Sequence, residues 1–293
     1  MPWQLSILLH SLLSGTRAIQ NRRIGKSQQD LSLYTLLVSF SLVAALGCLI
    51  AVLRSEPIDM DEVWSARFFL FVMAACFSVL NYMTFKLFRK LSASVIAIAS
   101  LLNPTAVVVI AAIFTSEVLL PRQWVGAIVL LAAVLFVQLR PKKKHKAAKE
   151  TMSIGVSTLS ILIIALLFGV GIVIEKHLLD RLGLSGYLAF GWGSQFIGVL
   201  VVVLLLRKKF RLPSNARMHA TVWSSGLLLV SAGFLFVLSQ VNSDSASLTS
   251  LSSTVKVVVT VLLAYIFLKE RDRMLQKSIA LTLSCIGLFL LFT

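Results

Sequence analysis

Long apolar runs separated by short polar connections extend over nearly the whole chain. A helix that spans a bilayer needs about 20 mostly apolar residues. Ten segments approach this length: roughly residues 3–20, 31–53, 65–87, 93–115, 122–139, 153–174, 184–206, 218–239, 245–268 and 275–292. The pattern predicts an all-α membrane protein with ten transmembrane helices. The first segment is short and carries His10 and several serines, so a helix lying on the membrane surface is the alternative there.

The chain also repeats itself. Residues 92–117 align with residues 245–270 at an offset of 153 residues, without a gap and with nine identities in 26 positions. The shared polar residues include Ser100 with Ser253 and Glu117 with Glu270. We therefore predict two five-helix halves, 1–140 and 151–293, joined by a basic linker at 141–150. Because five is an odd number, the second half would enter the membrane inverted, as in many secondary transporters.

Composition supports the membrane assignment and excludes other classes of protein. The chain is 58% hydrophobic and 14% charged, whereas a soluble domain carries about 25% charged residues. A soluble nucleic-acid-binding protein would share the net charge of +16 but not the apolar runs. The expected partners are therefore the lipid bilayer and a small-molecule solute, not nucleic acid; a homodimer is compatible with the sequence. The three cysteines are isolated, so neither a disulfide nor a metal site is expected.

Basic residues sort the predicted connections into two sets. If both termini face outward, 22 of the 28 Lys and Arg residues fall in inner connections, including Arg17 and Lys277. The acidic connection "RSEPIDMDEVW" then lies outside. Basic residues favour the cytoplasmic side, so we predict a multi-pass protein of the cell (inner) membrane with both termini outside.

Lys256 is the one basic residue that this sorting leaves in the middle of an apolar segment. A central lysine costs about 2.5–3.5 kcal/mol on insertion scales, so it should face a polar cavity or a partner. Thr249, Ser252, Ser253 and Thr260 recur with it at steps of three and four residues, which is one helix face. We predict that Lys256 binds an anionic group of the solute; a structural lysine held by a carboxylate or carbonyl groups is the alternative.

Asn103 is the repeat partner of Lys256 at the offset of 153. Pro104 follows it, lacks an N–H group and deprives the Ser100 carbonyl of its usual helical donor. A freed carbonyl inside a membrane is tolerated beside a cavity or another polar group. The pattern therefore predicts a polar site between the halves, with a simple packing kink as the alternative.

Further polar groups in apolar segments are candidates for the same site. They are Asn81 and Tyr82 in the third segment, Trp192 and Gln195 in the seventh, Ser253 in the ninth and His10 in the first. Helix–helix hydrogen bonding and interfacial anchoring are the alternatives for these residues.

The acidic residues are expected at helix ends. We interpret Glu117 and Glu270 as paired helix caps, with gating salt bridges as the alternative, and Glu175 as the end of the sixth helix. No carboxylate is then expected at the middle of the bilayer. The chain lacks a P-loop and the G-x-S-x-G and H-E-x-x-H motifs. We therefore predict no enzymatic activity and no bound cofactor or metal.

The segments "ASVIAIASLLNPTAVVVIAAIFTSEVLLPRQWVGAIVLLAAVLFVQL" and "ASLTSLSSTVKVVVTVLLAYIFLKERDRMLQKSIALTLSCIGLFLLF" resemble the drug/metabolite transporter superfamily, EamA-like branch. The resemblance implies a five-plus-five inverted-repeat transporter. One departure is Val257, which stands where the first half has Pro104.

The combined interpretation is a secondary transporter of a small organic metabolite or drug-like solute that works by alternating access, with an anionic group near Lys256. The cavity is expected between helices three, four, eight and nine, with contributions from one, six and seven. A lipid-linked sugar flippase of the same superfamily and a non-transporting membrane scaffold are the alternatives.

Overall fold

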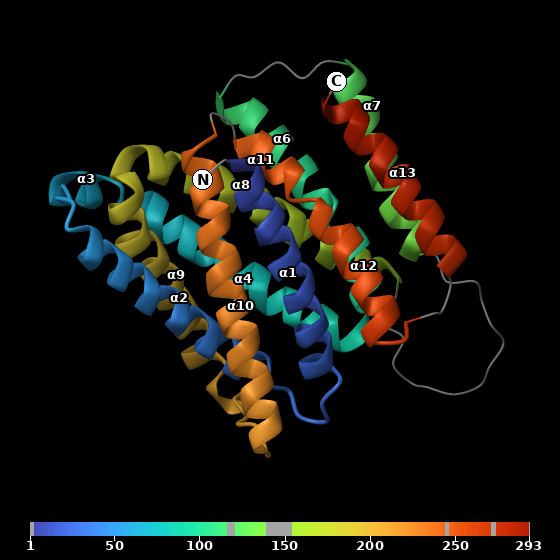
Figure 1. Cartoon of the computed structure of the whole chain (residues 1–293), viewed down its shortest axis with the longest axis horizontal. Coiled ribbons are helices and arrows are strands. Elements are labelled where there is room, and N and C mark those ends of the chain that lie inside the picture. Colours follow the sequence, from blue (N-terminus) through green and yellow to red (C-terminus); the bar gives the residue numbers. More distant parts are fainter. Residues whose placement is uncertain (1–2, 116–120, 139–153, 244–245, 271–273, 293) are drawn as a thin grey trace.

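The computed structural model describes residues 3–115, 121–138, 154–243, 246–270 and 274–292, and these form an all-α bundle (Figure 1). The predicted linker at 141–150 and Glu117 lie outside the described residues. The elements are α1 (Trp3–Gly25), α2 (Ser32–Arg54), α3 (Met60–Ser65), α4 (Arg67–Lys90), α5 (Ala93–Ala99), α6 (Leu102–Thr115), α7 (Pro121–Gln138), α8 (Ile154–Gly186), η1 (Tyr187–Gly191), α9 (Trp192–Leu205), η2 (Arg207–Lys209), α10 (Ala216–Val241), α11 (Ala246–Ser252), α12 (Val255–Phe267) and α13 (Met274–Phe292).

Each of the ten predicted segments corresponds to helix, but two of them are broken. Residues 93–115 form α5 and α6, and residues 245–268 form α11 and α12 instead of one continuous helix. The sixth and seventh segments follow each other almost without a gap, because α8 runs on to Gly186 and η1 begins at Tyr187. The turn within α8 lies at Gly183, whose φ of 66° is a conformation that glycine adopts without a Cβ penalty.

The helix bounds repeat at the offset found in the sequence. Helices α5 and α11 begin at Ala93 and Ala246, and α7 and α13 begin at Pro121 and Met274, so both pairs differ by 153 residues. The breaks after α5 and α11 fall at equivalent positions as well. The repeat is therefore present in the backbone and is more than a shared apolar composition.

Helix α1 lies in the middle of the bundle, packed against α10 and α12 (Figure 1). Its buried residues include Ser6, Ile7, His10, Ser11 and Gly15. The alternative of a surface-lying first helix is therefore wrong: its small and polar residues pack against neighbouring helices. Helices α7 and α13 pack against each other at one side of the bundle (Figure 1).

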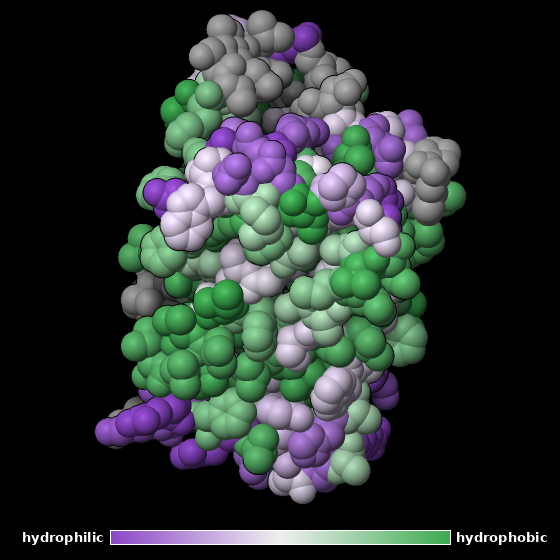
Figure 2. Space-filling view, turned by 90° about the vertical axis from the view of Figure 1, so that its left-hand side faces the viewer, coloured by the Kyte–Doolittle hydropathy of each residue, from purple (hydrophilic) through white to green (hydrophobic). Residues whose placement is uncertain are grey.

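On the face shown in Figure 2, a broad apolar band lies between two polar ends. Large apolar side chains stay exposed on the outside, among them Leu53, Phe71 and Leu205. Among the described residues, five apolar runs are long enough to cross a membrane: Ser32–Arg54, Arg67–Lys90, Ala93–Phe114, Thr158–Leu205 and Ala216–Val241. Apolar surface of this extent is stable in contact with lipid, which makes the chain a multi-pass membrane protein.

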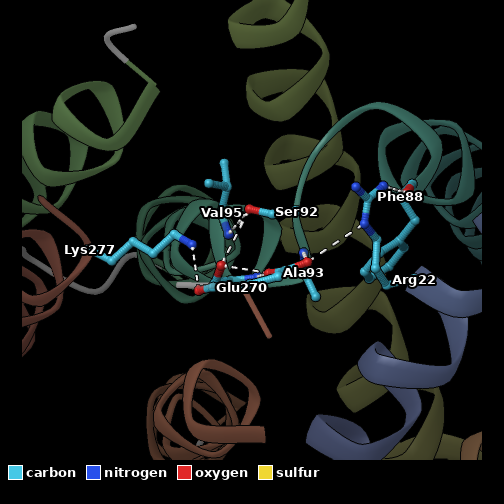
Figure 3. A network of polar contacts seen from close by, with 8 residues as sticks. Arg22, Phe88, Ser92, Ala93, Val95, Glu270 and Lys277 are labelled. Carbon is cyan, nitrogen blue, oxygen red and sulfur yellow. Dashed lines mark hydrogen bonds and ion pairs between the residues drawn. The ribbon is translucent and has the colours of Figure 1, made fainter. Parts of the chain in front are cut away.

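Glu270 joins the two halves at one end of the bundle (Figure 3). Its carboxylate accepts hydrogen bonds from the backbone N–H groups of Ala93 and Ser94, at 3.2 and 3.3 Å, and from the Ser94 hydroxyl at 2.9 Å. Its Oε1 also lies 3.7 Å from Nε of Arg22. A carboxylate at a helix N-terminus satisfies N–H groups that lack partners within the helix, so Glu270 caps α5. Its predicted pairing with an equivalent cap at Glu117 stays a prediction.

The connection between α1 and α2 is held by Asp30. Its carboxylate pairs with Lys86 and with Arg89 at the end of α4, the latter at 2.9 Å, and accepts a hydrogen bond from the Ser32 hydroxyl at 2.6 Å. Partial burial alone would raise the pKa of Asp30. The hydrogen bonds from Lys86 and Ser32 and the charge of Lys86 outweigh burial, so the pKa falls to about 2.

Candidate functional site: a central cavity

A cavity of ≈ 290 Å³ lies between the two halves. It is lined from eight of the predicted segments, which are the first, second, third, fourth, sixth, seventh, eighth and ninth. All seven segments that the sequence assigned to the cavity contribute, and the second adds Phe40 and Val43. A mostly apolar cavity with a few converging polar groups is typical of small-molecule sites.

Six of the eight predicted site residues line this cavity. They are His10, Asn81, Asn103, Trp192, Gln195 and Lys256. These residues come from α1, α4, α6, α9 and α12, so the fold brings together side chains that are up to about 250 positions apart in the sequence.

Tyr82 and Ser253 are placed elsewhere. Tyr82 packs in the cluster around Phe85 and Val199, and Nζ of Lys86 lies 5.2 Å from the centre of its ring. Ser253 is buried at the break between α11 and α12, where its hydroxyl donates to the Ser250 carbonyl at 2.6 Å. Neighbours in sequence point to different faces of a helix, so Tyr82 faces away from the cavity that Asn81 lines.

Both broken helices direct the start of their second part toward the cavity. Asn103 lies in the first turn of α6 and Lys256 in the first turn of α12, and both side chains line the cavity. In each break the residue's own N–H donates to a serine carbonyl three positions earlier, Asn103 to Ser100 and Lys256 to Ser253, both at 3.1 Å. The Ser100 carbonyl, which Pro104 leaves without its usual donor, is thereby satisfied. The N-terminal end of a helix carries partial positive charge, which favours anions.

The neighbours of the Lys256 ammonium group include an aromatic ring and a second cation. Its Nζ lies 5.6 Å from the centre of the Phe168 ring, which provides a cation–π contact. Among the residues that the structure describes, no carboxylate lies within ion-pair distance of it. The alternative of a structural lysine held by a carboxylate thus has no support in the described residues.

Arg17 is a cavity residue that sequence reasoning missed. The sequence assigned it to an inner connection, but it lies within α1 and lines the cavity. Its Nε is buried without a hydrogen-bond partner in the described structure, and its charge interacts with that of Lys256. The sequence did contain a signal that Arg17 faces the cavity. Ser14, three residues before it and on the same helix face, also lines the cavity. Lys277, likewise assigned to a connection, is buried within α13.

Glu175 corrects another prediction. It lies within α8, well before the end of that helix at Gly186, and it is 5% exposed and lines the cavity. The expectation that Glu175 marks the end of the sixth helix is therefore wrong. The apolar run ends at residue 174, but the helix continues for about two more turns to the turn at Gly183, with Leu178 and Leu179 buried in the core.

His10 is held in place by its neighbours in the cavity wall. Its Nδ1 lies 2.8 Å from the Ala232 carbonyl, so Nδ1 carries the proton and donates it. The Oγ of Ser14 lies 3.4 Å from Nε2, and the ring packs against Phe236 with the centroids 5.0 Å apart. The Ala232 carbonyl of α10 therefore orients the ring, and Nε2 points toward Ser14 of α1.

Comparison with known proteins agrees with the geometry. The EamA-like transporter family matches residues 1–139 and 156–293, which is nearly the whole chain in two parts. The chain belongs to the EamA-like transporter family. Its members are transporters and not enzymes, so the chain is a membrane transporter of small solutes. The recognition made from the sequence is thereby confirmed.

The EamA-like fold is also seen in a solved crystal structure of a protein that is 16% identical to this chain. The TM-score is 0.66, and the match covers 98% of this chain and 95% of that chain. At this identity the likeness supports the fold alone. No curated protein matches the chain.

Proposed function

We propose that this EamA-like protein is a secondary transporter that carries a small organic anion across the cell (inner) membrane by alternating access. Its ten membrane-crossing helices would form two inverted repeats, 1–140 and 151–293, with both termini outside. The helices would rock around the central cavity, which opens to one side at a time.

The observation that carries this proposal is the pair of cations in the cavity. Arg17 and Lys256 line the same space and repel each other. In the described part of the chain neither has a carboxylate within ion-pair distance. Two like charges in a low-dielectric cavity are costly, and an anionic solute offsets that cost. The start of α12 adds its dipole, and Asn103 and Asn81 supply polar groups that orient the solute.

Apolar side chains complete the site. Phe77, Phe168 and Phe236 line the cavity beside the cations and are suited to the hydrocarbon part of a solute. The polar groups come from both halves, and the aromatic rings line the same cavity. This combination favours an organic anion with an apolar body over an inorganic ion.

Thermal unfolding of the purified protein with matched solutes tests the proposal. Benzoate, benzyl alcohol and benzylamine share one ring and differ in charge. We expect benzoate to stabilise the wild-type protein, because only it complements Arg17 and Lys256. Lys256→Ala and Arg17→Ala should each lose this stabilisation, whereas Lys208→Ala, which removes an exposed lysine, should retain it.

Stabilisation by benzylamine alone, or equal benzoate stabilisation in Lys256→Ala, would contradict the proposal. A non-transporting scaffold would show binding without movement. Uptake of radiolabelled benzoate into proteoliposomes, in wild type and in Lys256→Ala, separates those two cases.

A further inference from the structure

Glu175 is a buried carboxyl group that solute binding to the cations does not explain. It is 5% exposed and lines the cavity from α8. Within the described ranges it has no cation within ion-pair distance. Burying an ionised carboxylate without a paired charge is costly, whereas its protonated form is neutral.

A group of uncharged polar side chains lies beside this carboxyl. The Tyr187 hydroxyl, which is fully buried in η1, lies beside the Glu175 carboxyl group and the Trp192 side chain. Nε2 of Gln195 donates to the same hydroxyl oxygen at 3.4 Å. Trp192 and Gln195, which the sequence assigned to solute binding, thus reach Glu175 through Tyr187. None of these neighbouring side chains carries a charge, so none of them compensates the charge of an ionised Glu175.

The charged side chains on the surrounding helices contact residues other than Glu175. Helix α4 presents the uncharged Met73 to the Tyr187 hydroxyl at 3.9 Å. Lys176 follows Glu175 but bonds to Asp180 at 2.7 Å and to the Gln240 carbonyl at 3.3 Å. The remaining titratable groups that share the cavity with Glu175 are on α1 and α12, namely His10, Arg17 and Lys256.

We propose that Glu175 is the proton-binding site of the carrier and that it couples solute movement to a proton. This inference rests on the proposed function. An anion in a cavity of ≈ 290 Å³ lies near Glu175 as well as near the two cations. Repulsion between the anion and an ionised Glu175 makes proton binding more favourable when the solute is bound, and the effect is reciprocal. Anion and proton therefore enter and leave together, and the proton moves to and from a carboxyl oxygen of Glu175.

The position of Glu175 gives the proton a short route to solution. Asp180 lies five residues further along α8 and its side chain is 60% exposed. Next to it, Nε of Arg181 pairs with Glu62 of α3 at 2.5 Å, at the end of the bundle where the acidic connection lies. Glu175 is therefore less than two helical turns from exposed ionisable groups.

Infrared difference spectroscopy of the full chain tests proton binding without any solute. On stepping the pH, the wild-type protein should show a carbonyl band of a protonated carboxyl group that disappears as the pH rises. Glu175→Gln should lose this band and Asp180→Asn should keep it. Tyr187→Phe should keep the band but shift its frequency, because the carboxyl group loses a polar neighbour. Identical spectra for wild type and Glu175→Gln overturn the proposal.

Coupling is tested by adding benzoate to weakly buffered protein and following proton uptake with a pH dye. We expect proton uptake by the wild type that Glu175→Gln loses and that Asp180→Asn retains. If benzoate stabilises the protein but equal proton uptake occurs in wild type and Glu175→Gln, or none occurs, the coupling is wrong. If benzoate fails to stabilise the protein, the anion site is wrong, and the infrared band decides the role of Glu175 independently.

Discussion

The two broken helices have the same geometry but differ in sequence at the residue usually held responsible for a break. Helices α5 and α6 are separated at Ser100 and Leu101, and α11 and α12 at the equivalent Ser253 and Thr254. The first break precedes Pro104, whereas the second has Val257 at that position. A proline is therefore not what the two breaks have in common.

A serine is what they share. The Ser100 hydroxyl donates to the Ala97 carbonyl at 2.7 Å, and the Ser253 hydroxyl donates to the Ser250 carbonyl at 2.6 Å. Serine hydroxyls that bind a carbonyl of the preceding turn compete with the helical ladder. The comparison teaches that the break belongs to the repeat, while the side chain that follows it, Asn103 or Lys256, differs between the halves.

Glu270→Ala is expected to have the largest effect. Glu270, in the second half, contacts the start of α5 and Arg22 of α1, which belong to the first half. The N–H groups of Ala93 and Ser94 and the Arg22 side chain lose their buried partner. Breaking a buried ion pair by removing one member costs about 3 kcal/mol, so the melting temperature should fall clearly. Glu62→Ala, which removes a carboxylate of an exposed pair with Arg181, is the control and should cost less than about 1 kcal/mol. Equal losses in both variants would show that Glu270 does not tie the halves together.

Lys256→Asn makes the two halves identical at this one repeat position and tests the asymmetry between Asn103 and Lys256. We expect benzoate affinity to fall at least about tenfold, or about 1.4 kcal/mol. The double exchange Lys256→Asn with Asn103→Lys returns a cation at the equivalent position and should recover part of the affinity. Isothermal titration of the three proteins measures this effect; no recovery in the double variant would argue against equivalent positions.

Substitutions at Pro104 and at its equivalent, Val257, test whether the proline or the shared serine causes the breaks. Pro104→Ala should change the free energy of unfolding by less than about 1 kcal/mol, since Ser100 maintains the break. Val257→Pro should cost more, about 1–2 kcal/mol, because the Val257 N–H donates to the Thr254 carbonyl at 2.8 Å. Denaturant unfolding measures both. A larger loss in Pro104→Ala than in Val257→Pro would reverse the conclusion about serine.

Asp30 provides the smallest predicted effect. The equivalent residue in the second half is Gly183. The first connection is fixed by the ion pairs of Asp30, whereas the chain turns at the second through the positive φ of Gly183. The pKa of Asp30 is lowered from 3.8 to about 2, so the stability it contributes is complete above pH 3.8 and disappears as the pH falls through about 2. After allowance for solvent screening this is about 1 kcal/mol. Circular dichroism melting across this pH range should show the step in wild type and not in Asp30→Asn; a step of equal size in both would assign it to other carboxyl groups.

The sequence by itself determined the helices and the repeat. Apolar periodicity is a local property, so each of the ten predicted segments corresponds to helix. The offset of 153 residues recurs in the starts of α5 and α11 and of α7 and α13. It also predicted eight residues for the site, and six of them line the cavity. Polar side chains such as Lys256 and Asn103 are unfavourable anywhere else in an apolar helix.

Only the tertiary structure decided which charged residues near helix ends are buried. Arg17 stands before Arg22 and Arg23 and resembles a residue of the connection, and Glu175 directly follows an apolar run. Neither position differs locally from an exposed helix end. Their burial depends on how far the neighbouring helices extend beside them, on α10 and α12 packing along α1 and on the core contacts that prolong α8. That information lies in residues distant in sequence, which is why the two cavity charges became evident only once the helices were packed.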